Sequence, residues 1–142
     1  MATTSRPNVL ILIPHDLGDH LNCYGHPTVR SPHINGFASE GIRLTNYYTS
    51  APECTSSRSC MLTGLHSHQN GLMGLGGWGW ELFPHVPHLA ARLRDGGYST
   101  HLFGMHHEGS GPAEPLGYQH HVRSQGNRAA DVCRNVVEFL KG

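Results

Sequence analysis

Apolar runs separated by polar clusters predict a chain in which strands and helices alternate. Val9–Ile13 is short, continuous and rich in β-branched residues, and it lies between Pro7 and Pro14, which predicts a buried strand of a parallel sheet. Ile42–Tyr48 and Tyr98–Phe103 are also rich in β-forming residues, so we expect two further strands there. Polar residues follow the first and the third run, at the end of a strand where open α/β sheets bind ligands.

Helical signals lie between and after these runs. The first expected helix has Ser31 as its N-cap, Pro32 at its first position and Gly41 at its end. Apolar spacing and turn residues predict three more helices. These are Ser57–Leu65, Pro87–Asp95 and Asn127–Leu140. Inward faces are expected at Ile34, Phe37 and Ala38 in the first helix and at Val132, Val136, Phe139 and Leu140 in the last. Loops are expected at 50–58, Gly71–Gly79 and Pro112–Gln125.

This order of elements predicts an α/β fold, mainly a parallel sheet flanked by helices. The 142 residues are enough for one domain, and 37% of them are hydrophobic, so a core can form. A strand would normally follow the last helix of a βαβ unit. We therefore expect residues 1–142 to be an incomplete α/β domain.

Charge and composition exclude some classes of function. Lys+Arg and Asp+Glu both number 10, so the chain lacks the basic surface expected of a nucleic-acid-binding protein. The sequence has no apolar stretch long enough to predict a membrane segment. The start of the chain does not read as a secretory signal, which favours a cytoplasmic location with the four cysteines as free thiols. The 13 histidines suggest metal or acid–base chemistry, although most are expected on surfaces and loops.

Cys54 and Arg58 carry the strongest chemical signal. A thiol just ahead of a helix N-terminus lies in the field of the helix dipole, which stabilises an anion. Arg58 follows one turn later and can contact two oxygens of a sulfate or phosphate group. Ser56 and Ser57 are expected to cap the helix. The residues alone indicate an anion site with a nucleophile, and a capped helix with a buried cysteine is the alternative.

Four segments, in chain order, resemble the sulfatase family. "CTSSRSCMLTG" is similar to the signature C-x-P-S-R-x-x-x-L-T-G, and it matches at Cys54, Ser57, Arg58, Leu62, Thr63 and Gly64. Segments 7–27 and 31–54 resemble the family's opening strand with its acidic metal motif and the approach to the nucleophile. Segment 88–109 resembles the helix and strand that end in G-K-x-H. "HSHQNGLMGL" and "WGWEL" look closest to the heparan N-sulfatase (sulfamidase-like) branch.

The resemblance implies an alkaline-phosphatase-like fold, with residues 1–142 as the N-terminal part of the catalytic domain. It also implies an enzyme that hydrolyses sulfate esters, or sulfamates, of sulfated sugars. Such an enzyme uses one divalent metal, usually Ca²⁺. The resemblance implies that a formylglycine-generating enzyme oxidises Cys54 to formylglycine, whose hydrate attacks sulfur and later expels sulfate. Cys54 would then be both nucleophile precursor and metal ligand, and Arg58 would stabilise the sulfate charge. Asp16 would bind the metal, and His107 would contact the nucleophile or the substrate oxygens.

Three positions depart from the family pattern. His15 stands where a first metal-binding Asp is usual, and imidazole is a poor calcium ligand. His15 is therefore a ligand of a softer metal, a contact to the substrate, or a residue that points away from the metal. Ser56 replaces the Pro that the modifying enzyme reads, which bears directly on the conversion of Cys54. Met105 replaces the catalytic Lys, so a contact to sulfate is missing unless His106 supplies it. The family's later metal-binding segment has no counterpart in this sequence, so we expect little turnover by the chain alone.

Several alternatives stay open. The protein is a sulfatase, a phosphonate or phosphate monoester hydrolase of the same superfamily, or an inactive truncated relative. Asp19 and His20 either reach the substrate or lie on a loop surface. The His66/His68 pair supplies two possible zinc ligands. Trp78 and Trp80 either stack on a sugar or cover the core.

Overall fold

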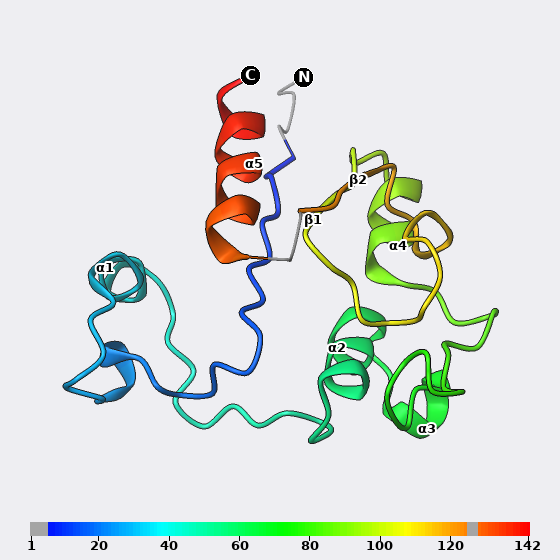
Figure 1. The fold of residues 1–142 in the computed structure, drawn as a ribbon, viewed down its shortest axis with the longest axis horizontal. Coiled ribbons are helices and arrows are strands. Elements are labelled where there is room, and N and C mark those ends of the chain that lie inside the picture. The colour runs from blue at the N-terminus through cyan, green and yellow to red at the C-terminus, as the bar shows by residue number, and fades with distance from the viewer. Residues whose placement is uncertain (1–5, 125–127) are drawn as a thin grey trace. The chain divides into compact units, whose positions relative to one another are not determined.

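The computed structural model describes residues 6–124 and 128–142. The chain divides into two compact units, Met1–Tyr47 and Tyr48–Gly142, and each is described by itself (Figure 1). The first holds the 3-10 helix η1 (Asn22–Tyr24) and helix α1 (Pro32–Glu40). The second holds α2 (Cys54–Thr63), α3 (Ser67–Asn70), α4 (Leu89–Asp95), β1 (His101–Phe103), η2 (Glu114–Leu116), β2 (His120–Val122) and α5 (Ala129–Lys141). No helix in the described residues is both long and apolar enough to cross a membrane.

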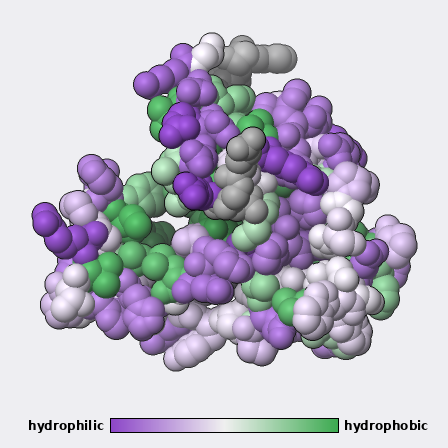
Figure 2. Space-filling model, viewed as in Figure 1, coloured by the Kyte–Doolittle hydropathy of each residue, from purple (hydrophilic) through white to green (hydrophobic). Residues whose placement is uncertain are grey.

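Helix α1 confirms the first predicted helix. Ser31 is its N-cap, Pro32 is its first residue and Gly41 follows its end. The Ser31 hydroxyl makes no capping bond and instead donates to Asn35 Oδ1 at 3.0 Å. Asn35 Nδ2 donates to Asn22 Oδ1 at 2.8 Å, so this polar network joins η1 to α1. The side of α1 predicted to face inward is open, because Ile34 is 46% and Phe37 81% exposed. Figure 2 shows hydrophobic residues, in green, at the surface in the region of α1.

The two strands predicted in the first unit are wrong. Val9–Ile13 and Ile42–Tyr48 have no strand hydrogen bonds, and Leu12 is 76% and Ile42 91% exposed. A strand exists only when a neighbouring strand accepts and donates its backbone bonds. In the described residues the sheet has two strands, β1 and β2, and neither belongs to these segments.

The parallel character of the predicted sheet is confirmed in the second unit. Strands β1 and β2 pair in parallel, with His101 opposite His120 and Phe103 opposite Val122. Strand β1 is shorter than the predicted Tyr98–Phe103, and β2 lies inside the segment Pro112–Gln125 that was expected to be loop. The sequence "HHV" of β2 has weak β-propensity, so pairing with β1 and not local preference forms this strand.

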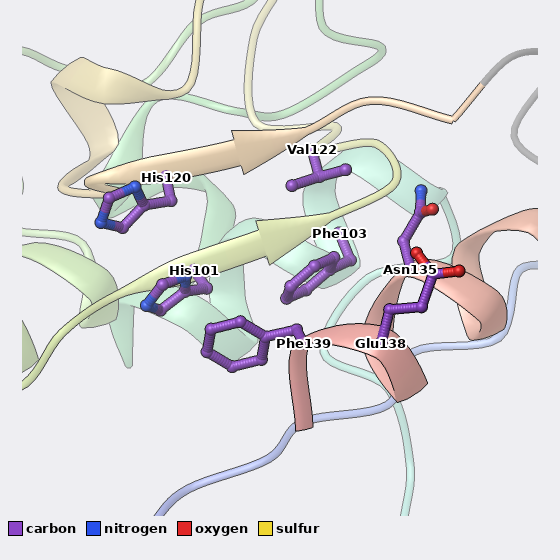
Figure 3. A pocket seen from close by; sticks show the side chains of 7 residues that line it. All are labelled: His101, Phe103, His120, Val122, Asn135, Glu138 and Phe139. Carbon is purple, nitrogen blue, oxygen red and sulfur yellow. The ribbon is translucent and has the colours of Figure 1, made fainter. Parts of the chain in front are cut away.

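Helix α5 packs on the sheet through Phe139. The ring of Phe139 lies 4.4 Å from that of His101 and 5.4 Å from that of Phe103, measured between centroids. A groove of about 360 Å³ lies between the sheet and α5 (Figure 3). Its lining residues are His101, Phe103, His120, Val122, Asn135, Glu138 and Phe139. The prediction of a helix here is confirmed for Ala129–Leu140, while Asn127 lies outside the described residues.

Two features hold the helices of the second unit together. Asn70 is fully buried, and its amide donates to Ser59 Oγ at 3.0 Å and to Leu65 O at 3.3 Å, which joins α2 to α3. Its Oδ1 accepts the Leu72 N–H at 2.9 Å. Gly117, with φ of 106°, passes so close to α4 that an added Cβ would overlap backbone atoms of Ala91. The Asn70 bonds connect α2 with α3, and the Gly117 contact connects the segment after η2 with α4.

Candidate active site

The N-terminus of α2 positions Cys54. The predicted helix began at Ser57, but α2 begins at Cys54 itself, and the Ser57 N–H donates to the Glu53 carbonyl at 2.8 Å. Ser56 and Ser57 do not cap the helix, since Glu53 is the N-cap residue and makes no side-chain bond there. The N–H groups of the first helical turn have no acceptor within a helix, so the dipole and these donors favour an anion beside Cys54.

Cys54 and His107 meet although 53 positions separate them. His107 Nδ1 lies 3.3 Å from Cys54 Sγ, within hydrogen-bond distance for sulfur. His107 follows β1 in the segment "GMHHEG", and the Cys54 side chain is half-buried. The structure thus brings together two residues that the sequence placed in one site. This arrangement lets an imidazole exchange a proton with a group at position 54.

Arg58 lies one turn after Cys54 and is 9% exposed. Its positive charge acts on Tyr118, whose pKa is raised to about 12 by burial and by Glu108, while Arg58 opposes that rise. A buried cation therefore lies in the same part of the unit as the buried carboxylate of Glu108. A fixed cation in a water-poor site stabilises developing negative charge strongly.

Glu108 is a residue that the sequence did not single out. It is 3% exposed, and its Oε2 accepts the backbone N–H of His107 at 2.9 Å. The same oxygen lies 3.8 Å from Nδ1 of His106. Glu108 thus fixes the backbone of the histidine that contacts Cys54. No periodic pattern marks this residue, and a charged residue between His and Gly in a predicted loop reads as surface.

His106 and His88 lie in the interior around Glu108. Burial lowers the pKa of both imidazoles, and the charge of Glu108 partly opposes this. The ring of His106 lies 5.9 Å from that of His121, and the ring of His88 lies 5.5 Å from that of Tyr118. His106 contacts Glu108, His121 and the backbone of Gly111, and these contacts do not place it in the role of the missing Lys.

The glycine-rich loop abuts the site. The Gly76 N–H donates to Thr55 Oγ1 at 3.3 Å, and a Cβ added at Gly76 would lie 3.1 Å from the His107 carbonyl oxygen. Glycine therefore permits a close approach of this loop to the residues that flank Cys54 and His107. The loop carries Trp78, which is 82% exposed, and Trp80, which is 40% exposed. Trp78 does not cover the core.

Asp16 and His15 belong to the first unit. Asp16 has a φ of 54°, in the left-handed region, and 82% of its side chain is exposed. His15 Nε2 lies 3.6 Å from its Oδ2. Calcium takes six to eight oxygen ligands, and this pair offers one carboxylate, so the described residues do not complete a calcium site. The metal-ligand set of Asp16, His15 and Cys54 stays a prediction.

Other candidate residues have simpler surroundings. All four cysteines are free thiols, and Cys60 is buried with Sγ 3.4 Å from Ser67 Oγ. The rings of His66 and His68 stack at 5.9 Å, and the described residues add no third metal ligand to this pair. Asp131 pairs with Arg134 at 3.2 Å on α5.

Comparison with known proteins places the chain in a family. The sulfatase family model matches residues 7–139. The chain is 37% identical to human arylsulfatase D over 88% of its own length, and 36% identical to mouse steryl-sulfatase over 84%. It is 31% identical to an N-acetylgalactosamine-6-O-sulfatase of Bacteroides thetaiotaomicron over 84%. It spans about a quarter of these relatives: 23%, 21% and 24% of their lengths, in that order.

A solved structure from work on glycosaminoglycan metabolism by Bacteroides thetaiotaomicron has the same α/β fold. It superposes with a TM-score of 0.63 and 28% identity, over 73% of this chain and 25% of that one. The resemblance to the heparan N-sulfatase branch stays a prediction. The family match, the relatives and the shared fold agree with the Cys54–Arg58 signature, and the chain belongs to the sulfatase family.

Proposed function

We propose that the protein hydrolyses sulfate esters or sulfamates of sulfated sugars, with Cys54, converted to formylglycine, as its nucleophile. The observation that carries this proposal is the 3.3 Å contact between Cys54 Sγ and His107 Nδ1 at the start of α2, in a member of the sulfatase family. The matched relatives are sulfatases, which does not favour a phosphonate or phosphate monoester hydrolase.

Each residue of the site has a role in this proposal. The first N–H groups of α2 and the guanidinium of Arg58 attract the sulfate oxygens. His107 holds or transfers a proton at the nucleophile, and Glu108 keeps His107 in place through its backbone N–H. The family generally uses a divalent metal, which supplies further positive charge when bound. We propose that this metal is Ca²⁺ and that Asp16 is one of its ligands. The roles given above to Arg58, His107 and Glu108 do not depend on the metal.

The glycine-rich loop supports a sugar as substrate. Trp78 is 82% exposed on a loop that contacts Thr55 through Gly76, and an exposed indole can stack on the face of a sugar ring. One relative is named for action on N-acetylgalactosamine 6-O-sulfate, and others are steryl-sulfatases. We expect Trp78→Ala to weaken binding of a sulfated N-acetylhexosamine without changing binding of a steroid sulfate. Equal loss for both ligands would contradict the stacking role.

The mass of the peptide that contains Cys54 is the deciding measurement. Oxidation of the thiol side chain to an aldehyde lowers the mass by about 18 Da. We expect this change when the chain is co-expressed with a formylglycine-generating enzyme. An unmodified thiol under those conditions would contradict the formylglycine mechanism.

Turnover tests the nucleophile itself. We expect the small turnover of sulfated sugar by the chain to disappear in Cys54→Ala. Cys133→Ala is the matched control, because Cys133 is an exposed free thiol on α5, and we expect it to behave as the parent. A Cys54→Ala variant as active as the parent would rule out position 54 as the nucleophile.

A further inference from the structure

Three possible metal ligands gather on one loop of the first unit. The side chains of Asp19, His20 and His26 each offer one ligand atom, and these atoms all lie within 4.8 Å of one another. Asp19 Oδ1 lies 3.6 Å from His26 Nε2 and 4.0 Å from His20 Nδ1. The two imidazole rings meet edge to face, with centroids 5.0 Å apart. In the part of the chain that the structure describes, no other three His, Cys, Asp or Glu side chains gather in this way.

The backbone of this loop is held in place. The Leu21 N–H donates to the Asp19 carbonyl at 2.7 Å, and the His26 N–H donates to the Leu21 carbonyl at 3.3 Å. Gly25, with φ of 99°, ends η1 and turns the chain back toward Asp19. These bonds close the segment into one turn that keeps His20 and His26 near each other.

Side chains from α1 and beyond anchor the same loop. The Asn22 N–H donates to Ser31 Oγ at 3.3 Å, and Asn22 Nδ2 donates to the His26 carbonyl at 3.4 Å. Asn35 Nδ2 bonds Asn22 Oδ1, and Arg43 donates to the Cys23 carbonyl. The ligand-bearing turn is thus pre-organised, so binding an ion there orders little additional backbone.

The donor set selects the class of ion. Two imidazole nitrogens and one carboxylate oxygen suit Zn²⁺ and its neighbours, whereas calcium needs more oxygen ligands. Around a tetrahedral zinc ion with bonds of about 2 Å, ligand atoms lie roughly 3.3 Å apart. The separations of 3.6 Å and 4.0 Å from Asp19 must therefore shorten by less than about 1 Å. The Asp19 and His20 side chains are 75% and 67% exposed and have room to rotate.

The described residues of the first unit, 6–47, include no buried side chain, so an ion held by three of their side chains would add a cross-link that packing does not supply there. We propose that Asp19, His20 and His26 form a structural site for one divalent transition-metal ion of the Zn²⁺ type, with water completing its coordination. Asp16, the predicted ligand of the sulfatase metal, is not a member of this group.

Calorimetry of the untagged 142-residue chain with Zn²⁺, and visible absorption with Co²⁺, tests this site directly. We expect one ion per chain, and at least a tenfold weaker affinity in His20→Ala and in His26→Ala. His33→Ala is the matched control, because His33 is an exposed histidine on α1, and its affinity should equal that of the parent. Zn²⁺ should also slow amide exchange in residues 19–41 of the parent and not of His26→Ala.

The result is separable from the sulfatase chemistry, on which this site does not rest. Cys54→Ala and Asp16→Asn should bind Zn²⁺ as the parent does. Absence of stoichiometric binding would overturn the proposal. It would also fail if binding survived in both His20→Ala and His26→Ala, or if Asp16→Asn or Cys54→Ala removed it. Circular dichroism of each variant shows that a lost site is not a lost fold.

Discussion

Residues 48–142 bury Leu72, Cys60 and Ala90 among their helices, whereas the described residues before them, 6–47, bury no side chain. The later unit is held by tight packing and by buried hydrogen bonds, such as those of Asn70. The earlier unit is held by exposed polar bonds among Asn22, Ser31 and Asn35. Exposed bonds exchange with water and contribute less than buried ones. Equivalent substitutions should therefore have unequal effects in the two units.

The largest expected effect is that of Gly117→Ala. The new Cβ would overlap the backbone of Ala91, and a left-handed φ of 106° strains any residue other than glycine. We expect the free energy of unfolding to fall by about 2–5 kcal/mol, measured by urea denaturation. Gly111→Ala is the control, because nothing lies within 4 Å of its added Cβ. Similar stability of the two variants would show that α4 is not packed as described.

Asn70→Ala and Asn35→Ala compare the units directly. Asn70→Ala leaves the buried Leu72 N–H and Leu65 carbonyl without this partner, so we expect a loss of about 2–3 kcal/mol in the free energy of unfolding. Asn35→Ala removes bonds that water replaces, and we expect less than about 1 kcal/mol. Amide exchange of α2 and of α1 reports the two effects separately. Equal losses of unfolding free energy in Asn70→Ala and Asn35→Ala would contradict the difference proposed between the two units.

Acid should destabilise the later unit through its buried histidines. Burial lowers the pKa of His88 and His106 below the ordinary value of 6.5, so the unfolded chain binds protons that the folded chain does not. Stability is therefore full above pH 6.5 and falls as the pH drops from there toward the lowered values. Urea denaturation between pH 7.5 and pH 5 measures this slope.

His88→Gln tests whether His88 contributes to the pH dependence of the free energy of unfolding. The variant has no titrating group at position 88, so its stability should depend less steeply on pH, whatever its stability at pH 7.5. His33→Gln, at an exposed position on α1, should keep the slope of the parent. An unchanged slope in a double variant of His88 and His106 would contradict the role of burial.

Ser56→Pro should have the smallest effect on stability. Ser56 is 1% exposed, and its hydroxyl has no hydrogen-bond partner in the described residues. The first N–H of α2 that donates to a preceding carbonyl is that of Ser57, which bonds Glu53. A Pro at position 56 lacks only the N–H of residue 56, so it removes no hydrogen bond of the helix. We expect a change below about 1 kcal/mol and a larger converted fraction of Cys54 by mass spectrometry.

Ser59→Pro is the contrasting variant for that prediction. It places Pro inside α2, where a helix bond is lost, and should cost about 3 kcal/mol or more. If Ser56→Pro were equally damaging, the first turn of α2 would not begin at Cys54.

The sequence predicted what local chemistry determines. Caps and turn residues determine α1 and α4, so the predicted start of α1 at Pro32 and the predicted end of α4 at Asp95 are correct. Strands depend on partners, which is why Val9–Ile13 failed as a strand and β2 was missed. In the candidate site, Cys54 and Arg58 were visible because they lie one turn apart. His107 came from the family resemblance. Glu108 came from the structure, because no pattern in the sequence shows that this carboxylate is buried and accepts the backbone N–H of its neighbour His107.

The unbonded hydroxyl of Ser56 also bears on how this sequence evolves. Codons of the TCN class for serine and the CCN codons for proline differ by one base. Because a proline there removes no hydrogen bond of the folded chain, selection on stability barely opposes the exchange in either direction. The family signature at this position can therefore be lost and regained by single mutations while the fold is kept, and we expect the converted fraction of Cys54 to change with it.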